Sequence, residues 1–228
     1  MSKGIIVCFM GIDGSGKTTL AKNLQKTLDA TGVKYRYLWW LTAEKSLLRR
    51  IMRGASRLVR FNQRSKPKAG SATDGGSKSG NSHGSKGKPG IVMSIYQYVT
   101  LIDYTIQLFL KVWIPKKQGY VVICDRYIYD TIIAFDITFD YSEKKYNNLF
   151  GFFYRLAPKP DVFFIVDVPP EVAFGRKDDI PSVEFLLKPR AKYKAMAKTV
   201  NALQLDGTKS LDELNGIVLS EIQKHIGK

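Results

Sequence analysis

Cysteine, histidine and acidic residues are scarce in this chain of 228 residues. Cys8 and Cys124 lie inside apolar runs, so we expect two buried thiols rather than a disulfide or a redox site. His83 and His225 have no partner in the sequence that suggests a metal or general-base role. No apolar run reaches the roughly 18 to 20 residues that span a bilayer, and no signal peptide is visible. These absences predict a cytoplasmic protein without redox chemistry.

The charge is strongly unbalanced toward the basic side. Lys and Arg number 36 against 20 Asp and Glu, which gives a net charge of +16. Such a balance favours anionic partners, and nucleoside phosphates, RNA and an acidic membrane surface all qualify. The length and the 44% of hydrophobic residues suit one α/β domain over residues 1–228.

A glycine-rich segment between a predicted strand and a predicted helix gives the most specific signal. An apolar run at residues 5–10 leads into G-x-x-x-x-G-K-T at 11–18, and a helical pattern follows to Ala30. This is the phosphate-binding loop in its required context, where backbone N–H groups and a helix N-terminus surround phosphate oxygens. Lys17 would reach the β- and γ-phosphates of ATP, and the Thr18 hydroxyl would bind Mg²⁺. The residues predicted to bind nucleotide here are Gly11, Asp13, Gly14, Ser15, Gly16, Lys17, Thr18 and Thr19.

An acid and a base follow a second buried strand. The run at residues 120–124 is apolar throughout, which is typical of a parallel strand, and it is followed by Asp125 and Arg126. Ligands of doubly wound sheets bind at the carboxyl ends of strands. Asp125 would therefore orient Mg²⁺ or its waters, and Arg126 would hold a phosphoryl acceptor by a two-pronged contact. A structural Asp–Arg ion pair is the alternative.

Another apolar run, at residues 161–168, precedes a charged segment that begins at Arg176. A basic loop over about 175–184 can close on bound phosphates and exclude water, as a lid does. We expect a helix at 182–199, a last short strand at 203–206 and a final helix at 211–226.

The middle of the chain carries two unusual basic segments. Residues 43–61 predict an amphipathic helix, and five arginines spaced three or four residues apart form a stripe that starts on it. The stripe is either a solvated face or a contact to an anionic substrate, RNA or a membrane. Residues 65–90 are rich in Gly, Ser and Lys and predict a flexible insertion. The apolar helix that follows, at 91–114, is predicted to be broadly buried and to end at Pro115. The arginines of the stripe are Arg49, Arg53, Arg57, Arg60 and Arg64.

Four segments together make the chain resemble the thymidylate kinase family of P-loop nucleoside monophosphate kinases. They are FMGIDGSGKTT at 9–19, QGYVVICDRY at 118–127, DVPPEVAFGRK at 167–177 and LQLDGT at 203–208. The resemblance implies a three-layer P-loop kinase fold with a parallel five-stranded sheet flanked by helices. It also implies phosphoryl transfer from ATP to a nucleoside monophosphate, with dTMP as the best single acceptor, and a homodimer.

The resemblance further implies roles for individual residues. Asp13 matches the carboxylate that contacts the acceptor's sugar hydroxyl, and Arg126 matches the arginine that binds the acceptor phosphate. Arg176 lies where lid arginines meet the transferring group. The loop that covers adenine corresponds to Asp206, Gly207 and Thr208.

Several departures from the family pattern concern the acceptor. Met10 stands where an acid often precedes the loop, and no arginine lies between Ile91 and Leu110 to contact thymine. Ala134, or Phe135 if the register shifts, stands where a bulky aromatic is expected. These changes leave open another phosphorylated acceptor, including polyphosphate, and a nucleotide-binding module that docks on RNA or membrane.

Overall fold

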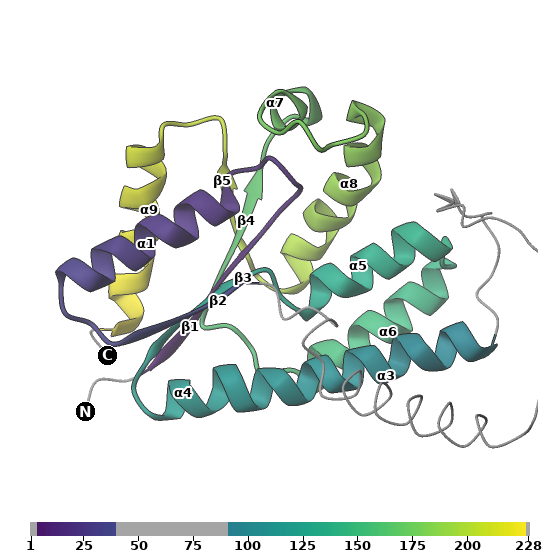
Figure 1. Cartoon of the computed structure of the whole chain (residues 1–228), viewed down its shortest axis with the longest axis horizontal. Helices are drawn as coiled ribbons and strands as arrows, with labels where there is room; N and C mark the ends of the chain where they lie inside the picture. The colour runs from purple at the N-terminus through teal and green to yellow at the C-terminus, as the bar shows by residue number, and fades with distance from the viewer. Residues whose placement is uncertain (1–3, 40–90, 227–228) are drawn as a thin grey trace, which may run out of the picture.

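A parallel five-stranded sheet forms the middle layer of the protein, in a computed structural model that describes residues 4–39 and 91–226 (Figure 1). The strand order is β2-β3-β1-β4-β5, and every pair of neighbours is parallel. The sheet predicted by the resemblance is therefore confirmed. The strands are β1 (Ile5–Met10), β2 (Tyr35–Trp39), β3 (Val121–Asp125), β4 (Val162–Asp167) and β5 (Leu203–Asp206).

Helices cover both faces of this sheet and complete a three-layer architecture (Figure 1). One face carries α1 and α9, and the other carries α3, α5, α6 and α8. A π-helical turn joins α3 to α4. The helices are α1 (Lys17–Ala30), α3 (Ile91–Leu108), the π-helical turn Phe109–Trp113, α4 (Ile114–Lys117), α5 (Ile128–Phe139), α6 (Glu143–Leu156), α7 (Pro170–Gly175), α8 (Val183–Thr199) and α9 (Leu211–Ile226).

The alternation of β1 divides its side chains between two cores. Ile5 and Phe9 pack with α1 and α9 on one face, whereas Ile6 and Met10 pack with α5 and α6 on the other. All six residues of β1 are buried, which is why the strand reads as one continuous apolar run. Cys8 and Cys124 are free and buried, as the sequence predicts.

The sheet register brings the predicted site segments to one edge. Phe9 pairs with Asp125 across β1 and β3, and Met10 pairs with Ile165 across β1 and β4. The loops that follow these strands therefore open at the same carboxyl edge, where ligands of parallel α/β folds bind. That edge carries the glycine-rich loop, Arg126 and the lid segment.

The helix expected at residues 91–114 differs from the prediction in two ways. It continues through the π-helical turn into α4, where Pro115 lies in the first turn instead of ending the element. Its apolar stripe is also exposed in the described structure, with Ile95 57%, Ile102 47% and Ile106 49% exposed, so the predicted burial is wrong.

Polar side chains of α3 are buried beside apolar ones such as Leu101 on the face that packs on the core. Gln107 donates to Asp103 at 2.8 Å, and Gln97 accepts a hydrogen bond from Tyr141 of the loop before α6. Hydrogen bonding removes most of the cost of burying a polar group. The pairing explains how this helix can turn polar residues toward the core.

Two predicted features lie outside the described residues, namely the arginine stripe at 49–64 and the insertion at 65–90. Within residues 4–39 and 91–226, no helix has the length and hydropathy required of a membrane span.

Candidate active site

The glycine-rich loop turns closely around the start of α1. Gly14 has φ 78°, and a Cβ there would lie 2.2 Å from the carbonyl oxygen of Ala173 in α7. Gly11 has φ 144°, and its Cβ would lie 2.4 Å from the carbonyl oxygen of Val166. Both the backbone angle and the close neighbours therefore require glycine. The loop packs against β4 and α7, and α1 begins at Lys17 with no acid in its first turn, so the positive end of its dipole can act on an anion.

Lys17 lies almost fully buried under this loop. Its residue is 4% exposed, and its Nζ donates to the carbonyl oxygen of Ile12 at 3.0 Å. Nζ is 3.6 Å from Oδ1 of Asp13. Burial, reinforced by the charge of Arg126, lowers the pKa of Lys17 to about 8. A buried ammonium in this state gains strongly from an incoming anion.

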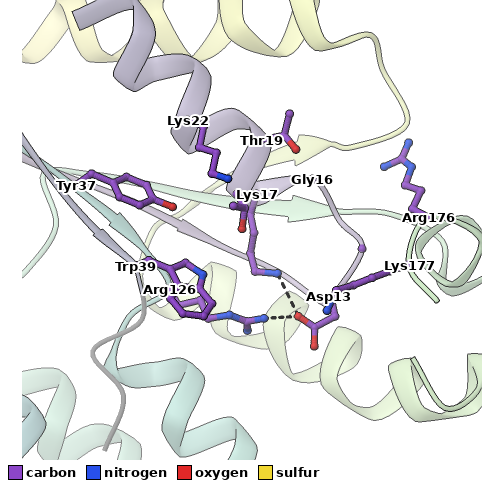
Figure 2. A pocket seen from close by; sticks show the side chains of 12 residues that line it. Asp13, Gly16, Lys17, Thr19, Lys22, Tyr37, Trp39, Arg126, Arg176 and Lys177 are labelled. Carbon is purple, nitrogen blue, oxygen red and sulfur yellow. Dashed lines mark hydrogen bonds and ion pairs between the residues drawn. The ribbon is translucent and has the colours of Figure 1, made fainter. Parts of the chain in front are cut away.

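Asp13 joins Lys17 to Arg126. Figure 2 shows both cations directed at the same carboxylate, with Lys17 coming from α1 and Arg126 from the end of β3. Burial opposes ionisation of Asp13, but Arg126 and Lys17 outweigh it and lower the pKa of Asp13. The two predicted phosphate-binding cations therefore converge on one point.

Arg126 has a second acidic partner that the sequence analysis missed. Its Nη1 donates to Oδ2 of Asp130 at 2.7 Å, one helical turn along α5. The other oxygen of Asp130 accepts a hydrogen bond from Tyr193 of α8. The spacing of four residues between Arg126 and Asp130 is a signal that could have found the first contact. Nothing in the sequence pairs Tyr193 with Asp130.

Asp125 is fully buried beside the loop and is only partly hydrogen-bonded. Its Oδ2 accepts from the Tyr37 hydroxyl at 3.0 Å, a contact that the sequence analysis also missed. Burial and the Asp125 carboxylate raise the pKa of Tyr37, so the phenol keeps its proton and donates. Oδ1 of Asp125 has no hydrogen-bond partner among residues 4–39 and 91–226.

That free carboxylate oxygen fits a magnesium ion or one of its waters. Mg²⁺ prefers oxygen ligands and usually keeps several waters and substrate phosphates in its shell. A cluster of three protein acids is therefore not required, and none occurs in the described structure. Thr18, in the first turn of α1, is half-buried at the same edge of the sheet. Thr18 and Asp125 are therefore the residues that would hold the ion of a magnesium nucleotide.

The predicted lid and adenine loop meet at Gly207. Nη1 of Arg176 donates to the Gly207 carbonyl at 3.0 Å. This arginine therefore contacts the loop after β5 and lies apart from the pair formed by Lys17 and Arg126 (Figure 2). Asp206 accepts from the backbone N–H of Thr208 at 3.0 Å and from its hydroxyl at 2.7 Å, and these bonds lower the pKa of Asp206. A Cβ on Gly207 would lie 3.0 Å from the Ser15 carbonyl oxygen. The loop at residues 206–208 therefore packs directly on the glycine-rich loop.

A cavity of about 930 Å³ brings most of these residues together. It is large enough for a nucleotide. Tyr37 and Trp39 line it from β2, and Lys22 lines it from α1 (Figure 2). The sequence-predicted residues that line it are Asp13, Gly14, Gly16, Lys17, Thr18, Thr19, Arg126 and Arg176, with Lys177 beside them.

The fold and this cavity define the class of protein: a nucleotide-binding α/β protein with a P-loop kinase fold. Among solved structures, a deoxyadenosine kinase from M. mycoides with dCMP and dCDP bound has the same fold. The TM-score is 0.57 at 13% identity, over 96% of this chain and 100% of that one.

Sequence comparison narrows the class, although no family model matches the chain. A probable thymidylate kinase of Methanocaldococcus jannaschii is 27% identical over 227 residues, which is 98% of each chain. A probable thymidylate kinase of Sulfurisphaera tokodaii is 28% identical over 91% of this chain and 90% of that relative. Probable thymidylate kinase 1 of Saccharolobus solfataricus is 31% identical over a shorter match, 50% of this chain and 61% of the relative. Over most of its length, the chain is therefore similar in sequence to archaeal proteins named probable thymidylate kinases.

Proposed function

We propose that this protein transfers the γ-phosphoryl group of ATP to the phosphate of a nucleoside monophosphate, with dTMP as the first acceptor to test. The observation that carries the proposal is the convergence of Lys17 and Arg126 on Asp13. One cation belongs to a loop that binds the donor phosphates, and the other follows the neighbouring strand. A donor and an acceptor phosphate bound to these two cations would lie next to each other.

Phosphoryl transfer requires little covalent chemistry from the protein. Its loose transition state is stabilised by in-line positioning and by positive charge around the transferred group. Lys17 neutralises the donor phosphates, and Arg126 orients the acceptor phosphate. Mg²⁺, held by Thr18 and Asp125 when bound, would supply further charge neutralisation. Arg176 lies at the start of the predicted lid, which would exclude water from the phosphates when nucleotide binds.

A different phosphorylated acceptor remains the second candidate, and the lining of the cavity favours testing it. No α3 side chain lines the described part of this cavity, whereas Tyr37 and Trp39 of β2 do. The base of the acceptor would then be recognised by contacts other than those expected of the family. A site that lacks one hydrogen bond to the base discriminates less between acceptors. A docking role on RNA or membrane depends on the arginine stripe, which lies outside the described residues.

The test is phosphotransfer from Mg·ATP to a panel of ribo- and deoxyribonucleoside monophosphates and polyphosphate, with an acceptor-free control. Arg126→Ala should lower kcat/KM for the acceptor by about 10²- to 10³-fold, the usual effect of removing a transition-state donor. Arg155→Ala is the matched control, because Arg155 is exposed on α6 and does not line the cavity. It should leave kcat/KM for the acceptor unchanged. The proposal would be contradicted by turnover that does not depend on Arg126. It would also be contradicted if ATP binds but no nucleotide in the panel is phosphorylated.

A further inference from the structure

The guanidinium of Arg126 is held between two carboxylates that differ in exposure. The Asp13 side chain is 40% exposed, whereas the Asp130 side chain is 4% exposed. Nη2 contacts Asp13 and Nη1 contacts Asp130. An acceptor phosphate that binds both Nη nitrogens of Arg126 competes with these two carboxylates for the guanidinium. The structure therefore raises the question of which carboxylate stays.

Asp130 has the arrangement expected of the permanent partner. Both of its oxygens are hydrogen-bonded, one to Arg126 and the other to Tyr193. Removing the cationic partner of a buried carboxylate is strongly unfavourable, because neither solvent nor another contact replaces it. Asp13 can leave Arg126 at much lower cost, because water reaches it and Lys17 remains 3.6 Å away.

The backbone of Arg126 limits how far its side chain can adjust. Arg126 has φ 83°, an uncommon angle for a residue with a side chain, and its N–H donates to the Phe9 carbonyl at 2.9 Å. With the backbone fixed in this way, the direction of the guanidinium depends on what its nitrogens contact. Although burial disfavours the charged form, Asp130 leads the groups that raise the pKa of Arg126.

Tyr193 connects this anchor to the helix that follows the lid. It is buried on α8, and burial together with Asp130 raises its pKa, so its hydroxyl keeps the proton that it donates. The same helix is attached to the end of β4, where Arg190 makes two hydrogen bonds to Asp167, at 2.7 and 3.0 Å. Tyr193 therefore lies on a fixed helix and can hold Asp130 in place.

We propose that Asp130 and Tyr193 are positioning residues for the acceptor phosphate. Asp130 stays with Arg126 and aims its guanidinium, while Asp13 exchanges for the phosphate. Tyr193 fixes the Asp130 carboxylate from α8. Asp13, once released, is free to accept a hydrogen bond from the acceptor's sugar hydroxyl, the role that the family resemblance implies for it. The inference rests on the proposed kinase function and adds two residues to it.

The decisive variant is Tyr193→Phe, which removes one hydroxyl and keeps the ring. We expect the KM for dTMP, or for whichever monophosphate the wild type accepts, to rise about fivefold, as loss of one hydrogen bond of ordinary strength implies. The KM for ATP should stay within about twofold. Asp130→Asn should raise the acceptor KM about tenfold or more by the same reasoning. Tyr129→Phe is the matched control, because the buried Tyr129 hydroxyl has no hydrogen-bond partner among the described residues.

A second measurement separates positioning from a general packing effect. In an Arg126→Ala background, Tyr193→Phe should change acceptor kcat/KM by less than about twofold, since it acts through Arg126. Calorimetric titration of dTMP without ATP should show the same order of affinities as the KM values.

The outcomes distinguish the inference from the function on which it rests. A wild type that neither binds nor phosphorylates any monophosphate overturns both. An active wild type with an unchanged acceptor KM in Tyr193→Phe overturns the inference alone. So does a Tyr193→Phe effect that raises both KM values equally or persists in the Arg126→Ala background.

Discussion

Replacing Lys17 by Met should make the unliganded protein more stable while it abolishes turnover. Lys17 is 4% exposed, and its pKa is lowered from 10.5 to about 8, chiefly by burial. A shift of about 2.5 units corresponds to about 3 kcal/mol of destabilisation when the lysine is charged in both states. Methionine keeps an unbranched chain without the charge.

One contact offsets part of this gain. The hydrogen bond from Lys17 to the Ile12 carbonyl is lost, which costs about 1 kcal/mol. The Ile12 carbonyl also accepts from the Ser15 N–H at 3.2 Å, so it does not lose every partner. The net gain at pH 7 is about 2 kcal/mol, or about 4 to 8 °C in Tm for a protein of this size.

The pH dependence gives the sharper test, and its sign follows from the lowered pKa. Between pH 8 and 10.5 the unfolded chain binds more protons at Lys17 than the folded protein does, so wild-type stability rises with pH in this window. The penalty is fully present below pH 8 and is lost as the pH approaches 10.5. The difference between Lys17→Met and the wild type should therefore shrink across this window.

Urea unfolding at pH 7 and at several points up to pH 10.5 measures both effects. Lys22→Met is the matched control, because Lys22 lines the same cavity from the same helix but is exposed. Its stability should stay within about 0.5 kcal/mol of the wild type. A Lys17→Met variant that is less stable at pH 7, or a stability difference that does not change with pH, would refute the reasoning.

Three further predictions use the same site. At pH 8, ATP binding should take up as much as about half a proton, because phosphates raise the pKa of Lys17; calorimetry in buffers of different ionisation enthalpy measures it, and no uptake contradicts it. Gly207→Ala should lower stability by about 1 to 3 kcal/mol and raise the ATP KM, since its Cβ would lie 2.5 Å from Val168 Cγ1. Gly216→Ala in α9, with nothing within 4 Å, should instead stabilise by about 0.5 to 1 kcal/mol, and equal effects of the two changes in thermal unfolding would refute the packing argument. Tyr37→Phe should raise the Mg²⁺ concentration needed for half-maximal turnover about tenfold, because Asp125 loses its hydrogen bond. An unchanged magnesium titration would show that Tyr37 does not orient Asp125.

The strands were predictable because a parallel sheet buried on both faces requires continuous apolar runs. The runs at 5–10, 120–124 and 161–168 correspond to β1, β3 and β4 within one or two residues. The burial of α3 was not predictable by the same rule. Gln97, for example, accepts a hydrogen bond through Oε1 from Tyr141, which lies 44 residues away in the sequence, while its Nε2 has no partner among the described residues. Hydrophobic periodicity carries no information about such pairing.

The candidate site divides in a similar way. Motif residues such as Lys17 and Thr18 could be named because backbone geometry and phosphate chemistry fix their spacing within one loop. The role expected of Asp13 came only from the family resemblance. The contacts of Tyr37 and Tyr193 span 88 and 63 residues of sequence. Only the folded chain brings these hydroxyls to Asp125 and Asp130. A motif search therefore does not find residues that orient the motif side chains, even where such residues hydrogen-bond directly to those side chains.

The carboxylate of Asp13 explains how this basic chain holds Lys17 and Arg126 close together. Two buried cations directed at one point repel each other, and Arg126 is among the causes that lower the pKa of Lys17. Asp13 offsets part of that repulsion, but its side chain is 40% exposed and open to exchange. An incoming anion must therefore bind these cations better than Asp13 does. A phosphate dianion that accepts two parallel hydrogen bonds from a guanidinium meets this condition, whereas a small monoanion does not. Under the proposed function, Asp13 would therefore favour phosphorylated ligands over simple anions.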